Sequence, residues 1–306
     1  MSELIKKQSF GVEIETYGIS REKAAKIIAN HFGTVNTIKH NRYSYDRWEC
    51  KDNKGRTWTA MSDCSIQDPT RISCVNGKVG CEIVTPLLQY EDIETLQEII
   101  RELRAGGAKA NSSCGIHVHV DAAMQDAKSL RRLVKFFFSR QDLIYDALQI
   151  GDRKDRWCKP ITESFMTVLR KDRNISLSSL ENEWYGRAND GAGYVDHSHY
   201  NHTRYHALNL HSYFTGKGIE YRLFNGTTHA GKIKAYIQFC LALSAWAIEA
   251  DESIRFNRKD GLTMKQKEDL WSSILRNRLG LVGKEFATCR QWMLDGFHQE
   301  VGQAAA

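Results

Sequence analysis

The sequence predicts an α+β protein in which several strands present a shared polar face. Four short segments alternate apolar and polar residues with period two, which is typical of strands with one buried face. These segments are 9–16, 79–85, 115–121 and 218–224. Longer segments repeat apolar residues at helical spacing and therefore predict helices. These are 20–32, 91–105, 129–150, 230–250, 263–279 and 284–294.

Capping residues and glycines mark the ends of several predicted helices. Ser20 can act as the N-cap of the first helix, and Gly33 ends it. The second helix stops at the pair Gly106-Gly107, where glycine leaves the helical conformation easily. The segment 230–250 is apolar on most of its circumference, so we expect it to be a buried helix.

Composition and charge narrow the class of protein. The 306 residues contain 43 Lys and Arg against 37 Asp and Glu, which gives a net charge of +6 with 11 histidines counted as neutral. This composition suits one or two globular domains and excludes disordered and fibrous classes. The charge surplus is mild, so nucleic acid is not indicated as a partner. No segment is long enough for a membrane span and the cysteines form no CxxC pair, so we expect a cytoplasmic protein.

Period-two alternation decides which side chains share a face of each strand. In the first strand, Glu13 and Glu15 lie opposite the apolar Val12 and Ile14. The polar faces of the other three strands carry Glu82, then His117 and His119, then Glu220 and Arg222. Solvated strand faces usually carry Thr, Lys, Ser and Arg, whereas these carry mainly Glu and His beside glycines that leave room for a ligand. The pattern therefore predicts a ligand site across the four strands.

The glutamates of this face raise a charge problem if the four strands are neighbours. Glu13, Glu15, Glu82 and Glu220 would then converge, and like-charged carboxylates cannot all stay ionised unless cations compensate them. Hard divalent cations with oxygen ligands provide that compensation, and two Mg²⁺ would balance four carboxylates, with a histidine completing one shell. Arg222 suits a phosphate or a developing anion better than a metal.

Other interpretations of these residues stay open. His117, His119 and Glu82 could form the zinc site of a hydrolase, and the face could belong to a binding protein without catalysis. Residues 226–232 fit the pattern GxxxxGK, but Ile233 stands where a P-loop has the Ser or Thr that binds Mg²⁺. We therefore interpret this segment as a turn before a helix.

Four motifs follow one another in an order that is characteristic of a known family. They are FGVEIE at 10–15, EIVTPL at 82–87, CGIHVHV at 114–120 and IEYRLFNGT at 219–227. Together they resemble the amidoligase family of the glutamine synthetase and glutamate–cysteine ligase superfamily. Each motif is short, but four in order with matching chemistry are specific.

The resemblance implies a glutamine-synthetase-like fold, in which helices back an antiparallel sheet with a concave active-site face. It also implies a reaction in which ATP phosphorylates a carboxylate and an amine attacks the acyl phosphate, giving an amide, ADP and phosphate. The implied cofactors are ATP and Mg²⁺ or Mn²⁺. The implied substrates are a carboxylate and an amine, belonging to an amino acid, a peptide or a peptide-like acceptor. The implied source of the protein is a bacterium or a phage.

The resemblance assigns roles to the residues of the polar face. It implies that Glu13, His117 and Glu220 hold a metal near the ATP phosphates. It implies that Glu15 and Glu82 hold a second metal near the carboxylate substrate.

The catalytic residues that the resemblance implies are His119, Glu220 and Arg222. His119 would lie near ATP, and Arg222 would stabilise the transferring phosphoryl group, since phosphoryl transfer depends on charge neutralisation and alignment. Further candidates for binding the nucleotide or the substrate are Arg204, Asn209 and Asp63.

The domain organisation that we expect has a ligase catalytic domain over 1–255 and a C-terminal helical extension over 256–306, where no motif is recognised. Within the first part, 152–209 is polar, aromatic and dotted with glycines. We expect this segment to be an irregular lid or insertion, because an acyl phosphate must be kept from water. The sequence leaves the oligomeric state open.

Overall fold

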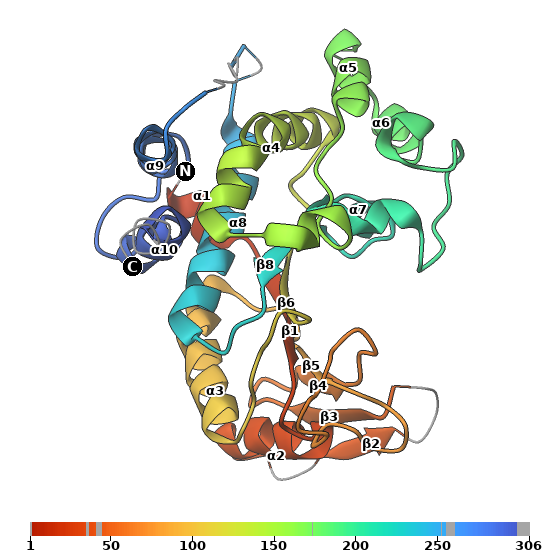
Figure 1. The fold of residues 1–306 in the computed structure, drawn as a ribbon, viewed down its shortest axis with the longest axis vertical. Coiled ribbons are helices and arrows are strands. Elements are labelled where there is room, and N and C mark those ends of the chain that lie inside the picture. The colour runs from red at the N-terminus through yellow and green to blue at the C-terminus, as the bar shows by residue number, and fades with distance from the viewer. Residues whose placement is uncertain are drawn as a thin grey trace. The chain divides into compact units, whose positions relative to one another are not determined.

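The computed structural model of the protein describes residues 2–34, 37–40, 45–172, 174–251, 253–254 and 261–298 (Figure 1). Within these residues the fold is α+β. An open antiparallel sheet of eight strands has the order β2-β3-β4-β5-β1-β6-β8-β7. The predicted α+β class and the antiparallel sheet are therefore confirmed.

The described strands include the four predicted ones, which are β1, β5, β6 and β8. In chain order the strands are β1 (Phe10–Thr16), β2 (Ile38–His40), β3 (Arg47–Lys51), β4 (Thr57–Met61), β5 (Cys81–Val84), β6 (Gly115–Val120), β7 (Leu208–Asn209) and β8 (Ile219–Asn225). The sequence analysis misses the other four. β2 and β7 are too short to show alternation, and the middle of β4 is buried at consecutive positions, which removes the alternation.

Six of the described α-helices correspond to the predicted ones, which are α2, α3, α4, α8, α9 and α10. The α-helices are α1 (Ser2–Lys7), α2 (Arg21–His31), α3 (Ile93–Ala105), α4 (Ala127–Leu148), α5 (Glu163–Lys171), α6 (Leu177–Trp184), α7 (His211–Phe214), α8 (Ala230–Glu249), α9 (Met264–Ser273) and α10 (Ala287–Trp292). Ser20 caps α2 as predicted, because its side chain accepts a hydrogen bond from the Lys23 N–H. Among the described helices, none combines the length and apolar character that a membrane span requires.

The chain divides into two compact units. The first, called the amino-terminal unit here, consists of Ser9–Val118 and Phe224–Ile237. The second, called the helical unit, consists of Met1–Gln8, His119–Leu223 and Gln238–Ala306. The predicted boundary at residue 255 stays a prediction, because 255–260 and 299–306 lie outside the described residues.

The core of the amino-terminal unit forms where α2 packs against β3, β4 and α3 (Figure 1). α2 buries Ala24, Ala25 and Ile28 on one face, and α3 buries a stripe that includes Leu96 and Ile100. Both helices therefore bury the apolar faces that their helical periodicity predicts.

The segment 152–209, which belongs to the helical unit, contains ordered helices. α5 and α6 begin at the N-caps Thr162 and Ser176, and they bury Phe165 and Trp184 completely. The expectation of an irregular segment is therefore wrong. These helices are only about two turns long, and such short apolar patterns are difficult to distinguish from a polar loop in sequence. Closure of this segment as a lid stays a prediction.

A charged network stabilises the amino-terminal unit away from the predicted site. The Arg56 guanidinium donates to the carboxylates of Asp52 at 2.7 Å and Asp92 at 2.6 Å, and Trp58 Nε1 donates to Asp52 at 3.3 Å. Burial alone would raise the pKa of Asp92, but hydrogen bonds from Arg56, the Gln89 N–H and Lys54 lower it well below its usual range. Asp52 is likewise buried, and its bonds to Arg56 and Trp58 lower its pKa.

Replacing Arg56 with methionine should lower the free energy of unfolding by about 3 kcal/mol, because the buried Asp52 loses its cation and the buried Asp92 keeps only Lys54. Urea denaturation at pH 7 measures this difference. Arg170→Met is the matched control, since it removes an exposed ion pair with Glu163 and should cost less than about 1 kcal/mol. Lowered aspartate pKa values contribute stability above about pH 4 that is lost as the pH falls through the folded-state pKa. The cost of Arg56→Met should therefore shrink below pH 4, and a constant cost would contradict the network.

Candidate active site

The pairing of β1 with β5 brings two predicted metal ligands opposite each other. Glu15 is the direct partner of Glu82 in the antiparallel register, so both side chains lie on the same face. Both are buried, with 5% and 9% of the residue exposed. Two neighbouring buried carboxylates repel each other and require a compensating cation or a proton.

His117 of β6 lies among the same glutamates. Its Nδ1 is 2.8 Å from Glu13 Oε2, and its Nε2 is 3.6 Å from Glu15 Oε1. The backbone N–H of Gly115 donates to the other Glu15 oxygen at 2.5 Å. The buried imidazole is therefore positioned between two carboxylates.

Among the described residues of the amino-terminal unit, two groups of side chains have the geometry of metal ligands. One consists of Glu13, Glu82 and His117, and the other of Glu15, Asp63 and Glu82. In each group, one ligand atom per residue lies within 4.8 Å of the others. Glu82 belongs to both groups, so its carboxylate is suited to bridge two ions. Carboxylate oxygens with at most one imidazole are the donors that fit Mg²⁺ or Mn²⁺.

Asp63 lies with the metal-ligand candidates, whereas the sequence analysis considers it for substrate or nucleotide binding. It follows β4, whose pairing places Met61 opposite Glu82. The Asp63 N–H donates to the carbonyl of Val79 at 3.1 Å. This bond holds Asp63 beside the segment that leads into β5. Recognition of β4 as a partner of β5 could have placed Asp63 near Glu82, but the sequence analysis misses this strand. Glu13, Glu15, Asp63, Glu82 and His117 are called the carboxylate set below.

A second set of predicted residues surrounds Glu220 in the helical unit. Asn209 pairs with Glu220 across β7 and β8, and its Nδ2 donates to Glu220 Oε2 at 2.6 Å. The Arg222 guanidinium donates to Glu220 Oε1 at 2.5 Å. Glu220 and Arg222 are both buried, with 4% and 7% exposed. Each oxygen of the Glu220 carboxylate thus accepts a hydrogen bond, which fixes its orientation.

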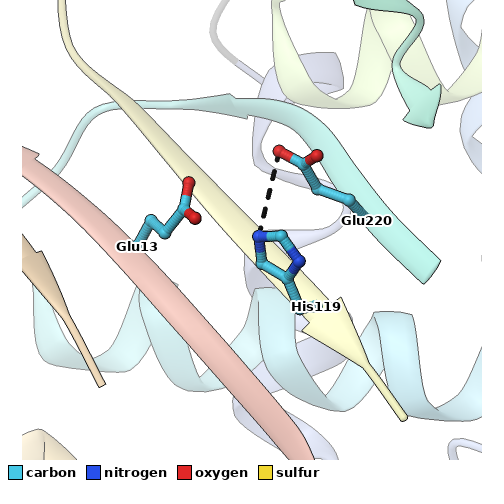
Figure 2. Close-up of side chains that lie close together, drawn as sticks. All are labelled: Glu13, His119 and Glu220. Carbon is cyan, nitrogen blue, oxygen red and sulfur yellow. Dashed lines mark ion pairs between the residues drawn. The ribbon is translucent and has the colours of Figure 1, made fainter. Parts of the chain in front are cut away.

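His119 of β6 belongs to this second set. Its Nε2 lies 3.9 Å from Glu220 Oε1, the ion pair that Figure 2 shows as a dashed line. Its Nδ1 lies 3.5 Å from the Ser212 hydroxyl. His119, Asn209, Glu220 and Arg222 are called the Glu220 set below.

Aromatic and cationic side chains flank Arg222. Its guanidinium lies 5.9 Å from the centre of the Tyr205 ring, and Trp157 packs edge-on against Tyr205 at 5.5 Å. Arg204, another predicted nucleotide or substrate residue, lies 5.7 Å from the same ring and donates to the carbonyl of His199 at 2.6 Å. Aromatic rings beside arginines can form a surface on which a nucleotide base stacks.

A buried pair that the sequence analysis misses supports α7 next to the Glu220 set. The Tyr185 hydroxyl lies 2.7 Å from His211 Nδ1. Burial, together with the charges of Arg204 and His197, lowers the pKa of His211 to about 4. His211 is therefore neutral at pH 7, and its ring can bond to Tyr185 while the next residue, Ser212, contacts His119. The long separation between residues 185 and 211 leaves no pattern in the sequence.

These features define an α+β protein with buried carboxylate and histidine clusters. A family model described as "putative amidoligase enzyme" matches residues 6–244, so the chain belongs to the amidoligase family and is a ligase-type enzyme. A search among curated proteins finds no match. The resemblance that the four motifs carry is thereby confirmed at the level of the family.

Proposed function

We propose that the protein is an ATP- and Mg²⁺-dependent carboxylate–amine ligase that forms an amide through an acyl phosphate. The observation that carries this proposal is the carboxylate set, in which two metal-ligand groups share Glu82, in a member of the amidoligase family. Of the four carboxylates, Glu15 and Glu82 are buried, and Glu13 and Asp63 are half-buried. Such a group of neighbouring carboxylates is costly unless cations neutralise it. A reaction with ATP would explain why these carboxylates are present, because the hard cations that they bind also bind phosphate oxygens.

The proposed metal ligands are the members of the carboxylate set, with Glu220 as a further ligand. Glu13, Glu82 and His117 would hold one Mg²⁺, and Glu15, Asp63 and Glu82 a second. When bound, these ions would neutralise negative charge on the phosphates and on the carboxylate substrate.

The proposed reaction has two chemical steps. A substrate carboxylate oxygen attacks the γ-phosphorus of ATP, the bond to the bridging oxygen breaks, and ADP leaves. The amine nitrogen then attacks the acyl carbon, the C–O bond to phosphate breaks, and the nitrogen loses a proton as the amide forms. Arg222 would stabilise the charge of the transferring phosphoryl group, and the Tyr205 and Trp157 rings would hold the base.

The polar face of the sheet would be the concave active-site face of a glutamine-synthetase-like fold. The segment 152–209 would close over it, because water hydrolyses an acyl phosphate. The carboxylate and amine would belong to amino acids, peptides or peptide-like acceptors.

Release of ADP tests the proposal. The full chain is incubated with ATP, Mg²⁺ and pools of carboxylates and amines, and ADP is measured while amide products are followed by mass spectrometry. We expect ADP formation that requires metal, carboxylate and amine together. Tightly bound zinc with hydrolysis that needs no ATP would instead support a hydrolase that uses His117 and His119. Binding of metal and ATP with no product from any pool would support a binding protein without catalysis.

A further inference from the structure

Arg21 is a buried charged residue that the proposed reaction does not use. It begins α2, and its side chain is 0% exposed. Its Nε donates to Asp46 Oδ2 at 2.8 Å, and its Nη1 donates to the carbonyls of Ser73 at 2.9 Å and Gly80 at 2.5 Å. A weaker bond reaches the carbonyl of Val75 at 3.3 Å. Of the four partners that Arg21 has among the described residues, three therefore lie in the loop that connects β4 to β5.

This loop, residues 62–80, carries Asp63 at its beginning and leads directly into β5 with Glu82. Its two ends approach closely, since the Asp63 N–H donates to the carbonyl of Val79 at 3.1 Å. Gly80 has φ +76, and a Cβ at this position would lie 2.8 Å from the Asp63 carbonyl oxygen. Glycine at 80 thus permits the contact that brings Asp63 beside the first residues of β5.

Ser73 links the middle of the loop to Gly80 at its end. Its hydroxyl accepts from the Gly80 N–H at 3.0 Å and donates to Asp68 Oδ2 at 2.6 Å. Burial raises the pKa of Asp68, but hydrogen bonds from Ser73 and Thr70 outweigh it and lower that pKa to about 2. The loop is therefore an ordered structure around one guanidinium, which contacts Ser73 in its middle and Gly80 at its end.

We propose that Arg21 is a positioning residue, which holds the loop so that Asp63 completes the metal site of Glu15, Asp63 and Glu82. The inference rests on the proposed function, since it takes this group as a metal site. Glu15 and Glu82 are fixed by strand pairing, whereas Asp63 lies beyond the end of β4 and depends on the loop. A planar guanidinium can bond to several carbonyls at once, and a lysine ammonium cannot reproduce that geometry.

Binding of Mn²⁺ to the full chain tests the inference. Isothermal titration calorimetry should show two Mn²⁺ per wild-type chain. Arg21→Lys should weaken one of them by about tenfold or more and leave the other unchanged, as loss of an outer-shell partner does. Ser73→Ala, which removes only the hydroxyl link to Gly80 and Asp68, should weaken the same ion by a smaller factor. Asp63→Asn should identify that ion by weakening it most.

Arg56→Met is the matched control, because it breaks a buried network of the same unit without touching the loop. It should lower the melting temperature and leave both Mn²⁺ affinities unchanged. The inference is overturned if Arg21→Lys and Ser73→Ala both keep two wild-type affinities, or if Arg56→Met weakens the same ion to the same degree. A wild-type chain that binds no Mn²⁺ would overturn the proposed metal site itself, and that result needs no variant.

Discussion

Replacing Glu82 with glutamine should abolish amide formation and weaken both Mn²⁺ ions, because Glu82 is the one residue shared by the two groups of the carboxylate set. We expect turnover to fall by about three orders of magnitude, since alignment and charge neutralisation supply most of the rate enhancement in phosphoryl transfer. Steady-state ADP release measures the rate, and calorimetry measures the affinities.

The order of stability of Glu82→Gln and wild type should reverse when metal is added. Without metal, glutamine relieves repulsion between Glu82 and Glu15, so the variant should be more stable by about 1 kcal/mol. With Mn²⁺ at about 100 times its dissociation constant, wild type should gain about 2.7 kcal/mol per ion, most of which the variant should not gain. Thermal unfolding in EDTA and in Mn²⁺ shows whether the order of stability reverses.

Glu94→Gln is the control for this substitution. Glu94 is an exposed residue of α3, so its replacement should change neither turnover nor the response to metal. A Glu82→Gln variant that is less stable in EDTA and binds two Mn²⁺ normally would show that Glu82 is a structural ion-pair partner and not a metal ligand.

Replacing Arg222 with lysine should lower kcat by about two to three orders of magnitude while Mn²⁺ affinity changes little. The charge is kept, but the planar fork that contacts Glu220 at 2.5 Å and faces Tyr205 is lost. Single-turnover measurements of ADP formation separate this loss of chemistry from weaker ATP binding. Arg170→Lys, in an exposed ion pair, is the control and should have wild-type kinetics.

A variant in which only the KM for ATP rises, with kcat unchanged, would contradict the proposed role of Arg222. Such a result would mean that the guanidinium binds the nucleotide equally in the ground state and in the transition state. Loss of Mn²⁺ binding in Arg222→Lys would instead show that Arg222 acts by orienting Glu220.

The polar face is the part of the molecule that the sequence predicts best, for a physical reason. Strand alternation is local, so the position of Glu13 and Glu15 on one side of β1 follows from the spacing of Val12 and Ile14 alone. The pairing of Glu15 with Glu82 joins residues far apart in the chain, and only the family resemblance indicates that their strands are neighbours.

The parts that could not be predicted depend on contacts between distant segments. Asp63 lies beyond a buried strand without alternation, and its place beside Glu15 depends on the loop around Arg21. Arg21 itself looks in sequence like an ordinary polar residue in the first turn of a helix. The helices of 152–209 are similarly short, and they are stabilised by burial of Phe165 and Trp184 and not by strong local preference.

The most direct measurement is transfer of ¹⁸O from the carboxylate substrate to phosphate. The chain is incubated with Mg²⁺, ATP, a pool of carboxylates labelled with ¹⁸O and a pool of amines, and the inorganic phosphate is analysed by mass spectrometry. An acyl phosphate predicts one ¹⁸O in each phosphate released with an amide. ADP formation with unlabelled phosphate would show attack by water, and AMP with pyrophosphate would show an acyl adenylate. Either result would contradict the proposed ligase mechanism.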